Sequence, residues 1–67
     1  MDLHNVRESF HNVLKNRKLT VGQFSRKHDV PLWWLYRFGQ GKVENPRLRS
    51  LERLQKAIEI EAASAEH

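Results

Sequence analysis

Residues 19–46 read LTVGQFSRKHDVPLWWLYRFGQGKVENP, and they contain the strongest structural signals in the sequence. Residues 20–23 fit a capping box, in which a threonine hydroxyl and a glutamine side chain each accept from a backbone N–H at the start of a helix. Asp29 stands where the chain has to turn left-handed, a conformation that Asp tolerates better than most residues. Pro31 suits the first turn of a following helix, because its missing N–H is not needed there. The stretch therefore predicts two short helices joined by a tight turn.

The second of these helices is expected over about residues 31–38. Leu35 and Phe38 are spaced to face the core, and the sequence Gly39-Gln40-Gly41 ends the helix, since glycine adopts a left-handed conformation without steric penalty. Successive residues of a helix point about 100° apart, so the neighbouring Trp33 and Trp34 cannot both face inward. We expect Trp34 to pack against the body of the domain and Trp33 to be the more exposed of the two.

Two longer helices flank this pair. Apolar residues at helical spacing predict an amphipathic helix over residues 3–16, with Asp2 as its N-cap. Asn45-Pro46 indicates a last helix from position 47 or 48 onward. Its expected apolar stripe is Leu48, Leu51, Leu54, Ala57 and Ile58. Residues 60–67 belong to an alanine-rich, acidic end that we expect to fray. The expected fold is thus a compact all-α domain of four helices.

The length of 67 residues allows one domain, taken here as residues 1–67. The chain has no cysteine, which excludes disulfides and zinc–thiolate sites. No apolar stretch approaches the roughly 18 residues that a membrane span needs, and no signal peptide is recognisable. We therefore expect a soluble, intracellular protein with no membrane partner.

Positive charge is concentrated on the part of the chain that contains the two short helices. Residues 15–53 hold ten Lys and Arg residues against three acids, a net charge of +7, whereas the whole chain carries +4. Such a distribution suits a polyanionic partner. Two helices joined by a tight turn, the second one exposed among basic residues, are typical of a helix-turn-helix that presents one helix to the major groove of DNA.

Enzyme chemistry finds no support in the sequence. His4 and His11 are seven residues apart, but a third ligand at metal-binding spacing is missing, and His28 lies in the expected turn. No Ser–His–Asp arrangement, carboxylate pair or phosphate-binding glycine loop stands out. We expect no catalysis, no cofactor, no metal ion and no small-molecule substrate.

The sequence resembles the lambda-repressor-like helix-turn-helix family of phage repressors and Cro proteins. The resemblance runs without gaps over about 40 residues and extends, through the first helix, over nearly the whole chain. The matching positions are Leu19-Thr20, Phe24, Asp29-Val30, Leu35, Phe38, Gly41, Asn45-Pro46, Leu48, Leu51 and Leu54. It implies a four-helix, lambda-repressor-like domain that binds operator DNA as a homodimer. A transcriptional regulator of this type, most often a phage or plasmid repressor, would act in the cytoplasm of a bacterial cell or a phage-infected host.

The chain departs from the family pattern at several positions. Asp29 replaces the usual turn glycine, and Pro31 replaces the usual hydroxyl cap of the DNA-reading helix. Family members commonly pair a buried Arg on the first helix with a Glu at the end of the third. The matching positions are Leu14 and Gly39, so both partners are absent together and no charge is left buried alone.

The resemblance also implies which residues contact DNA. The candidates for reading bases are Leu32, Trp33, Tyr36 and Arg37. The candidates for binding the DNA backbone are Thr20, Gln23, Gln40, Lys42, Asn45, Arg47 and Arg49. Arg37 can contact guanine with two hydrogen bonds or bind a phosphate, and apolar side chains can contact thymine methyls or sugars.

An alternative function uses the same fold to bind another protein. The surface of Leu32, Trp33 and Trp34 motivates it, because aromatic residues are enriched at protein interfaces. In the DNA-binding hypothesis, the contacts of a homodimer are expected on the last helix, at Ile58, Ile60, Ala62 and Ala63.

Overall fold

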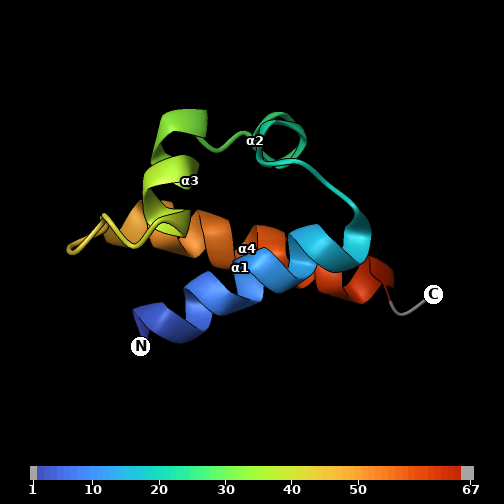
Figure 1. Cartoon of the computed structure of the whole chain (residues 1–67), viewed down its shortest axis with the longest axis horizontal. Coiled ribbons are helices and arrows are strands. Elements are labelled where there is room, and N and C mark those ends of the chain that lie inside the picture. The colour runs from blue at the N-terminus through green and yellow to red at the C-terminus, as the bar shows by residue number, and fades with distance from the viewer. Residues whose placement is uncertain (1, 66–67) are drawn as a thin grey trace.

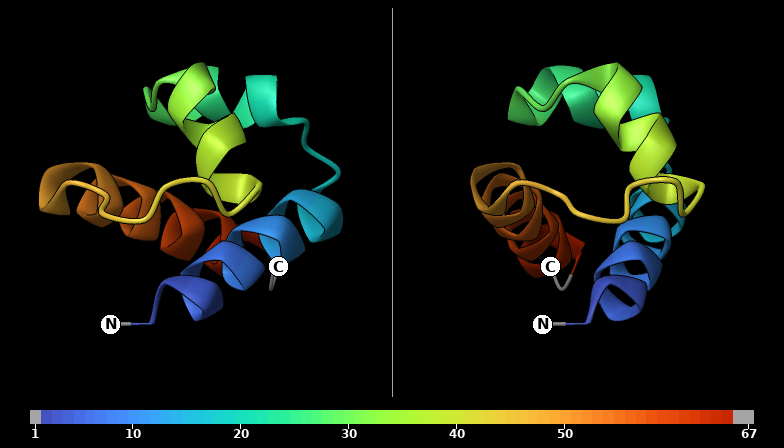
Figure 2. Two further views of the ribbon diagram at one scale, coloured as in Figure 1. Left: turned by 60° about the vertical axis from the view of Figure 1, so that its left-hand side comes forward. Right: turned by 90° about the vertical axis from the view of Figure 1, so that its left-hand side faces the viewer.

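The computed structural model describes residues 2–65 and is built of four helices in this part of the chain. They are α1 (Leu3–Arg17), α2 (Val21–His28), α3 (Leu32–Gly39) and α4 (Leu48–Ala65). The two longer helices, α1 and α4, pack against each other, and the short α2 and α3 stand above this layer (Figure 1). The two further views show the same two layers (Figure 2). The expected compact, all-α fold of four helices is confirmed.

The helix ends follow the capping signals in the sequence. The side chain of Asp2 accepts a hydrogen bond of 3.0 Å from the backbone N–H of His4. At the start of α2, the hydroxyl of Thr20 accepts from the N–H of Gln23 at 3.1 Å, and the Gln23 side chain accepts from the N–H of Thr20 at 2.9 Å. Pro31 is the N-cap of α3, so this helix begins and ends one residue later than the range of 31–38 expected from the sequence.

The core lies between the two layers. Five large side chains are fully buried there, namely Phe10, Phe24, Leu35, Phe38 and Leu54. The rings of Phe10 and Phe24 meet edge to face with their centroids 5.2 Å apart, which joins α1 to α2.

The predicted apolar stripe of α4 is correct from Leu51 onward but wrong for Leu48, which is 64% exposed. Leu54, which is fully buried, lies six positions after Leu48. At about 100° per residue, this spacing places the two side chains about 120° apart around the helix. Leu48 therefore lies off the face that meets the core.

Two side chains of α1 hold the C-terminal end of α3. The Nε of Arg7 donates to the carbonyl of Phe38 at 2.9 Å, and the Arg7 guanidinium lies 5.5 Å from the centre of the Phe38 ring. Nε2 of His11 donates to the carbonyl of Gly39 at 3.0 Å. The last carbonyls of a helix lack partners within it, and basic side chains satisfy them well.

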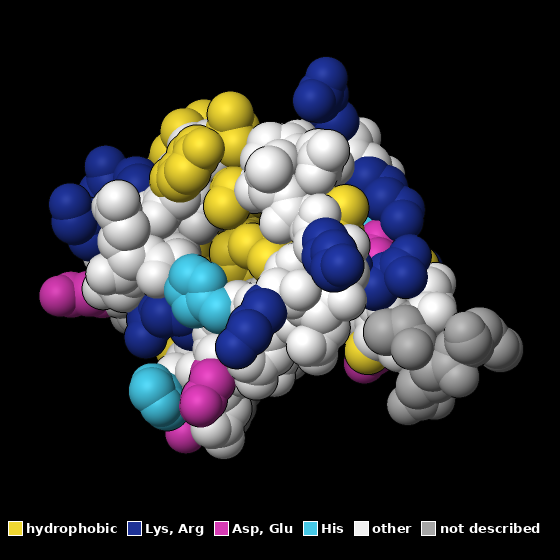
Figure 3. Space-filling model, turned by 45° about the vertical axis from the view of Figure 1, so that its right-hand side comes forward, with side chains coloured by type: hydrophobic (Ala, Val, Ile, Leu, Met, Phe, Trp, Pro, Cys, Tyr) yellow, Lys and Arg dark blue, Asp and Glu magenta, His cyan; other side chains and the backbone are white. Residues whose placement is uncertain are grey.

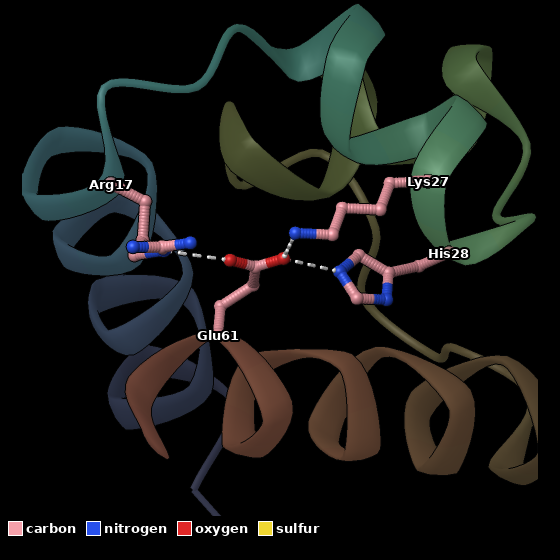
Figure 4. A network of polar contacts seen from close by, with 4 residues as sticks. All are labelled: Arg17, Lys27, His28 and Glu61. Atoms are coloured by element: carbon pink, nitrogen blue, oxygen red, sulfur yellow. Dashed lines mark hydrogen bonds and ion pairs between the residues drawn. The ribbon is translucent and has the colours of Figure 1, made fainter. Parts of the chain in front are cut away.

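The far end of α4 carries a buried carboxylate. The sequence predicts fraying from residue 60, but α4 continues to Ala65 and Glu61 is fully buried; residues 66 and 67 lie outside the described part of the chain. Figure 4 shows the Glu61 carboxylate between side chains from α1 and α2. Lys27 Nζ lies 2.6 Å and His28 Nε2 2.9 Å from one oxygen, and Arg17 Nε lies 3.0 Å from the other.

These contacts determine the charge state of Glu61. The hydrogen bond from Lys27 has the largest effect and lowers the pKa, burial opposes it, and the hydrogen bonds from His28 and Arg17 lower it further. Together they lower the pKa of Glu61 to about 2. The carboxylate is therefore ionised at neutral pH and joins α1, α2 and α4. This ionic contact explains why the C-terminal end of α4 packs against α1 and α2.

The same substitution at two glycines should have opposite effects on stability. Gly41 has a φ of +77°, which strains any residue with a Cβ, so Gly41→Ala should lower the free energy of unfolding by about 1–2 kcal/mol. Gly22 lies inside α2, where an added Cβ would find its nearest neighbour 3.9 Å away, at the hydroxyl oxygen of Thr20. Gly22→Ala should therefore raise stability by about 0.5–1 kcal/mol. Urea denaturation of both variants measures the two shifts, and shifts of the same sign would contradict the assigned backbone conformations.

Candidate nucleic-acid interface

Helix α3 divides its side chains between the core and the surface. Leu35 and Phe38 are fully buried, as expected. Trp34 is 8% exposed, and its ring stacks on Phe38 with the centroids 5.1 Å apart and the planes 9° from parallel. Trp33, one residue away, is 66% exposed. The prediction that Trp34 packs against the domain while Trp33 is the more exposed is confirmed.

The outward side of α3 carries all four residues that the sequence proposes for reading bases. Leu32 is 41% exposed and Tyr36 is 51% exposed, and both Trp33 and Arg37 are exposed beside them. Figure 3 shows hydrophobic side chains gathered over α3, with Lys and Arg side chains on both sides of them. We call these four residues the outer face of α3.

The turn before α3 is held by contacts from two helices, α2 and α4. Asp29 adopts the left-handed conformation with a φ of 55°, as predicted. Its carbonyl accepts a hydrogen bond of 3.2 Å from Nη1 of Arg53 on α4. The hydroxyl of Ser25 on α2 donates to the carbonyl of Val30, whose side chain is buried. Because the turn is held from α2 and α4, and the far end of α3 from α1, the outer face has a fixed orientation.

A hollow of about 510 Å³ opens between α3 and the loop that leads to α4. Three cations line it, namely Arg37 from α3 and Lys42 and Arg47 from the loop, with Glu44 as the one acid among its lining residues. Trp33 and Asn45 also line it, so the structure brings together five residues that the sequence proposes for DNA contacts. A concave surface that combines cations with an indole ring suits a partner carrying both negative charge and flat or apolar groups.

The remaining candidates for binding the DNA backbone lie apart from this hollow. Gln40 is exposed at the C-cap of α3, and Arg49 is exposed in the first turn of α4. Thr20 and Gln23 are exposed at the start of α2, where each side chain accepts a hydrogen bond within the capping box. The free hydroxyl hydrogen of Thr20 and the amide hydrogens of Gln23 remain available to a phosphate.

Sequence reasoning missed part of this site. Pro31, Trp34 and Ser50 line the hollow, although none was among the proposed DNA contacts. These residues line the hollow only because of the path that residues 42–47 take. That path could not be predicted, since residues 42–47 have no helical periodicity. The contacts of Arg7 and His11 with the end of α3 were also not predicted, because their carbonyl partners lie 31 and 28 residues away along the chain.

Comparison with known proteins returned no match to any family model, any curated protein or any solved structure. No helix within residues 2–65 combines the length and the apolar character that crossing a membrane requires. In the same part of the chain, no three His, Cys, Asp or Glu side chains are grouped as metal ligands.

Proposed function

We propose that the protein is a sequence-specific, double-stranded DNA-binding transcriptional regulator, and that α2 and α3 form a helix-turn-helix. The observation that carries this proposal is the outer face of α3, which contacts from α1, α2 and α4 hold beside a hollow lined by Arg37, Lys42 and Arg47. A helix about 10–12 Å across fits the major groove, where the edges of all four base pairs can be distinguished.

In this proposal the outer face of α3 enters the groove and its basic surroundings bind phosphates. Arg37 offers a planar pair of donors that matches guanine O6 and N7, and it can also reach a phosphate from the rim of the hollow. Lys42, Arg47 and Arg49 neutralise phosphates, supported by Gln40 and Asn45 and by Thr20 and Gln23 at the start of α2. Occupation of an operator in this way would regulate transcription in a bacterial or phage-infected cell.

A single α3 covers few base pairs, so the proposal includes a homodimer on a palindromic site. Its half-sites would lie about one turn of DNA, roughly 34 Å, apart. Ile60 is 47% exposed on α4, and Ala62 and Ala63 are exposed near it, whereas Ile58 packs partly against the core. The exposed three are the residues proposed for the dimer contact.

The runner-up function is a protein-interaction module that uses the same face. It is favoured by the exposure of Leu32, Trp33 and Tyr36, because contiguous exposed apolar residues often mark protein interfaces. Trp34 does not belong to this surface, since it is buried against Phe38.

A fluorescence titration separates the two functions. In a Trp34→Phe variant, Trp33 is the only reporter, and duplex DNA should change its emission because the exposed indole enters the groove. The apparent affinity should fall with salt, with a log–log slope of about 0.9 for each phosphate neutralised. The matched control is polyglutamate, which carries charge but no groove or bases and should leave the Trp33 emission unchanged. Trp33 emission that stays unchanged when duplex DNA is added at low salt would contradict DNA binding and favour the protein-interaction module.

A further inference from the structure

The outer face of α3 has little capacity for hydrogen bonding to bases. Leu32 has no polar group, and Trp33 offers a single N–H donor. Tyr36 carries one hydroxyl, so Arg37 is the only side chain of the face with several donors in a fixed geometry. The side chains of Leu32, Trp33 and Tyr36 are nonetheless 41%, 66% and 51% exposed, so a partner would bury mainly apolar surface on this face.

The major groove offers apolar surface at one kind of base. Thymine carries a methyl group on C5, where cytosine has only a hydrogen, and neither purine has a methyl group in the major groove. Burial of a methyl-sized apolar group against Leu32 or Trp33 is favourable, and a cytosine at the same place would present an amino donor to side chains that cannot accept from it. An apolar face of this composition therefore discriminates thymine from the other bases.

We infer that α3 selects thymine through its methyl group, with Leu32 and Trp33 as the residues that determine this specificity. The inference rests on the proposed function. Arg37 supplies the second contact, to a guanine. Trp33 and Arg37 are one helical turn apart, about 6 Å along the axis, which corresponds to nearly two base-pair steps of 3.4 Å. The preferred half-site accordingly places thymines within about two base pairs of a guanine.

The position of the cations favours DNA as the partner of this face. Arg37, Lys42 and Arg47 line the hollow into which Trp33 also faces, so the apolar side chains stand directly beside positive charge. In the major groove, base edges lie between two phosphate-bearing strands, which is the same arrangement of apolar methyls flanked by negative charge.

Replacement of thymine by uracil tests the inference, since it removes the methyl and leaves the base pair intact. Each thymine of a selected duplex is exchanged for uracil in turn, and the dissociation constants are measured. We expect a loss of about fourfold at each contacted position, the value for burial of one methyl group. In the variants Leu32→Gln and Trp33→Gln the ratio of the uracil and thymine constants should return to one at the position each residue contacts. In the matched variant Arg47→Gln all affinities should fall and the ratio should persist.

Three outcomes overturn the inference or its basis. A duplex bound selectively but with equal affinity for thymine and uracil at every position overturns the inference alone. A ratio that persists in both Leu32→Gln and Trp33→Gln overturns the assignment to these residues. Failure to retain any duplex in low salt contradicts the proposed function instead.

Discussion

Replacement of Glu61 by glutamine should lower the free energy of unfolding by about 2–3 kcal/mol, because it breaks a buried ionic contact shared by three helices. In the parent, both oxygens of Glu61 accept from donors on Arg17, Lys27 and His28. In glutamine, an NH₂ group replaces one of these oxygens, so a donor would face either Arg17 or the pair of Lys27 and His28. Arg17 and Lys27 are 34% and 49% exposed and can be rehydrated, which keeps the loss below that of a fully enclosed pair. For a domain of this size, the melting temperature should fall by about 10–20 °C.

The effect of Glu61 also has a defined pH dependence. The pKa of this carboxyl is lowered from 4.5 to about 2, so its stabilising contribution is complete above pH 4.5 and is lost as the pH falls toward 2. The stability difference between the parent and Glu61→Gln should therefore shrink as the pH falls from 4.5 to 2. Calorimetry at several pH values measures this difference.

Glu59 provides the matched control for Glu61. It lies on the same helix, it is exposed, and Glu59→Gln makes the same change of charge. This substitution should alter stability by no more than about 0.5 kcal/mol at any pH. Equal losses in the two variants would contradict the buried ionic contact.

The local signals in the sequence specify the helix ends well. Thr20 and Gln23 form the predicted capping box, and Asp29 adopts the predicted left-handed conformation. Such features depend on a few adjacent residues, so sequence alone contains the necessary information. The separation of Trp33 and Trp34 was predictable for the same reason, since it follows from the rotation per residue.

Features that depend on distant residues were harder to predict. Glu61 follows Leu54 and Ala57 at core spacing, so periodicity alone would place it inside. A carboxylate at such a position is expected to be buried only if it finds partners, and Arg17 and Lys27 lie 44 and 34 residues earlier in the chain. The hollow beside α3 depends in the same way on the path of the loop that carries Lys42 and Arg47. The assignment of this surface to DNA remains a prediction.

Arg37 and Arg47 should differ in the kind of DNA binding they support. Arg37→Ala removes a pair of donors from the outer face of α3, so discrimination at one base pair should fall by about fivefold to 150-fold, equivalent to 1–3 kcal/mol. Arg47→Ala removes a cation from the loop side of the hollow. It should weaken binding to all duplexes about equally and reduce the salt slope by about 0.9. Both side chains are exposed, so neither substitution should change the melting temperature measurably.

Selection of bound sequences from a random duplex pool measures whether the outer face of α3 reads bases. The parent protein should enrich a defined motif arranged as a palindrome, Arg47→Ala should enrich the same motif with lower yield, and Arg37→Ala should lose preference at one position of each half-site. Base reading by the outer face of α3 would be contradicted if the pool kept its starting composition. It would also be contradicted if the parent and Arg37→Ala enriched the same sequences equally.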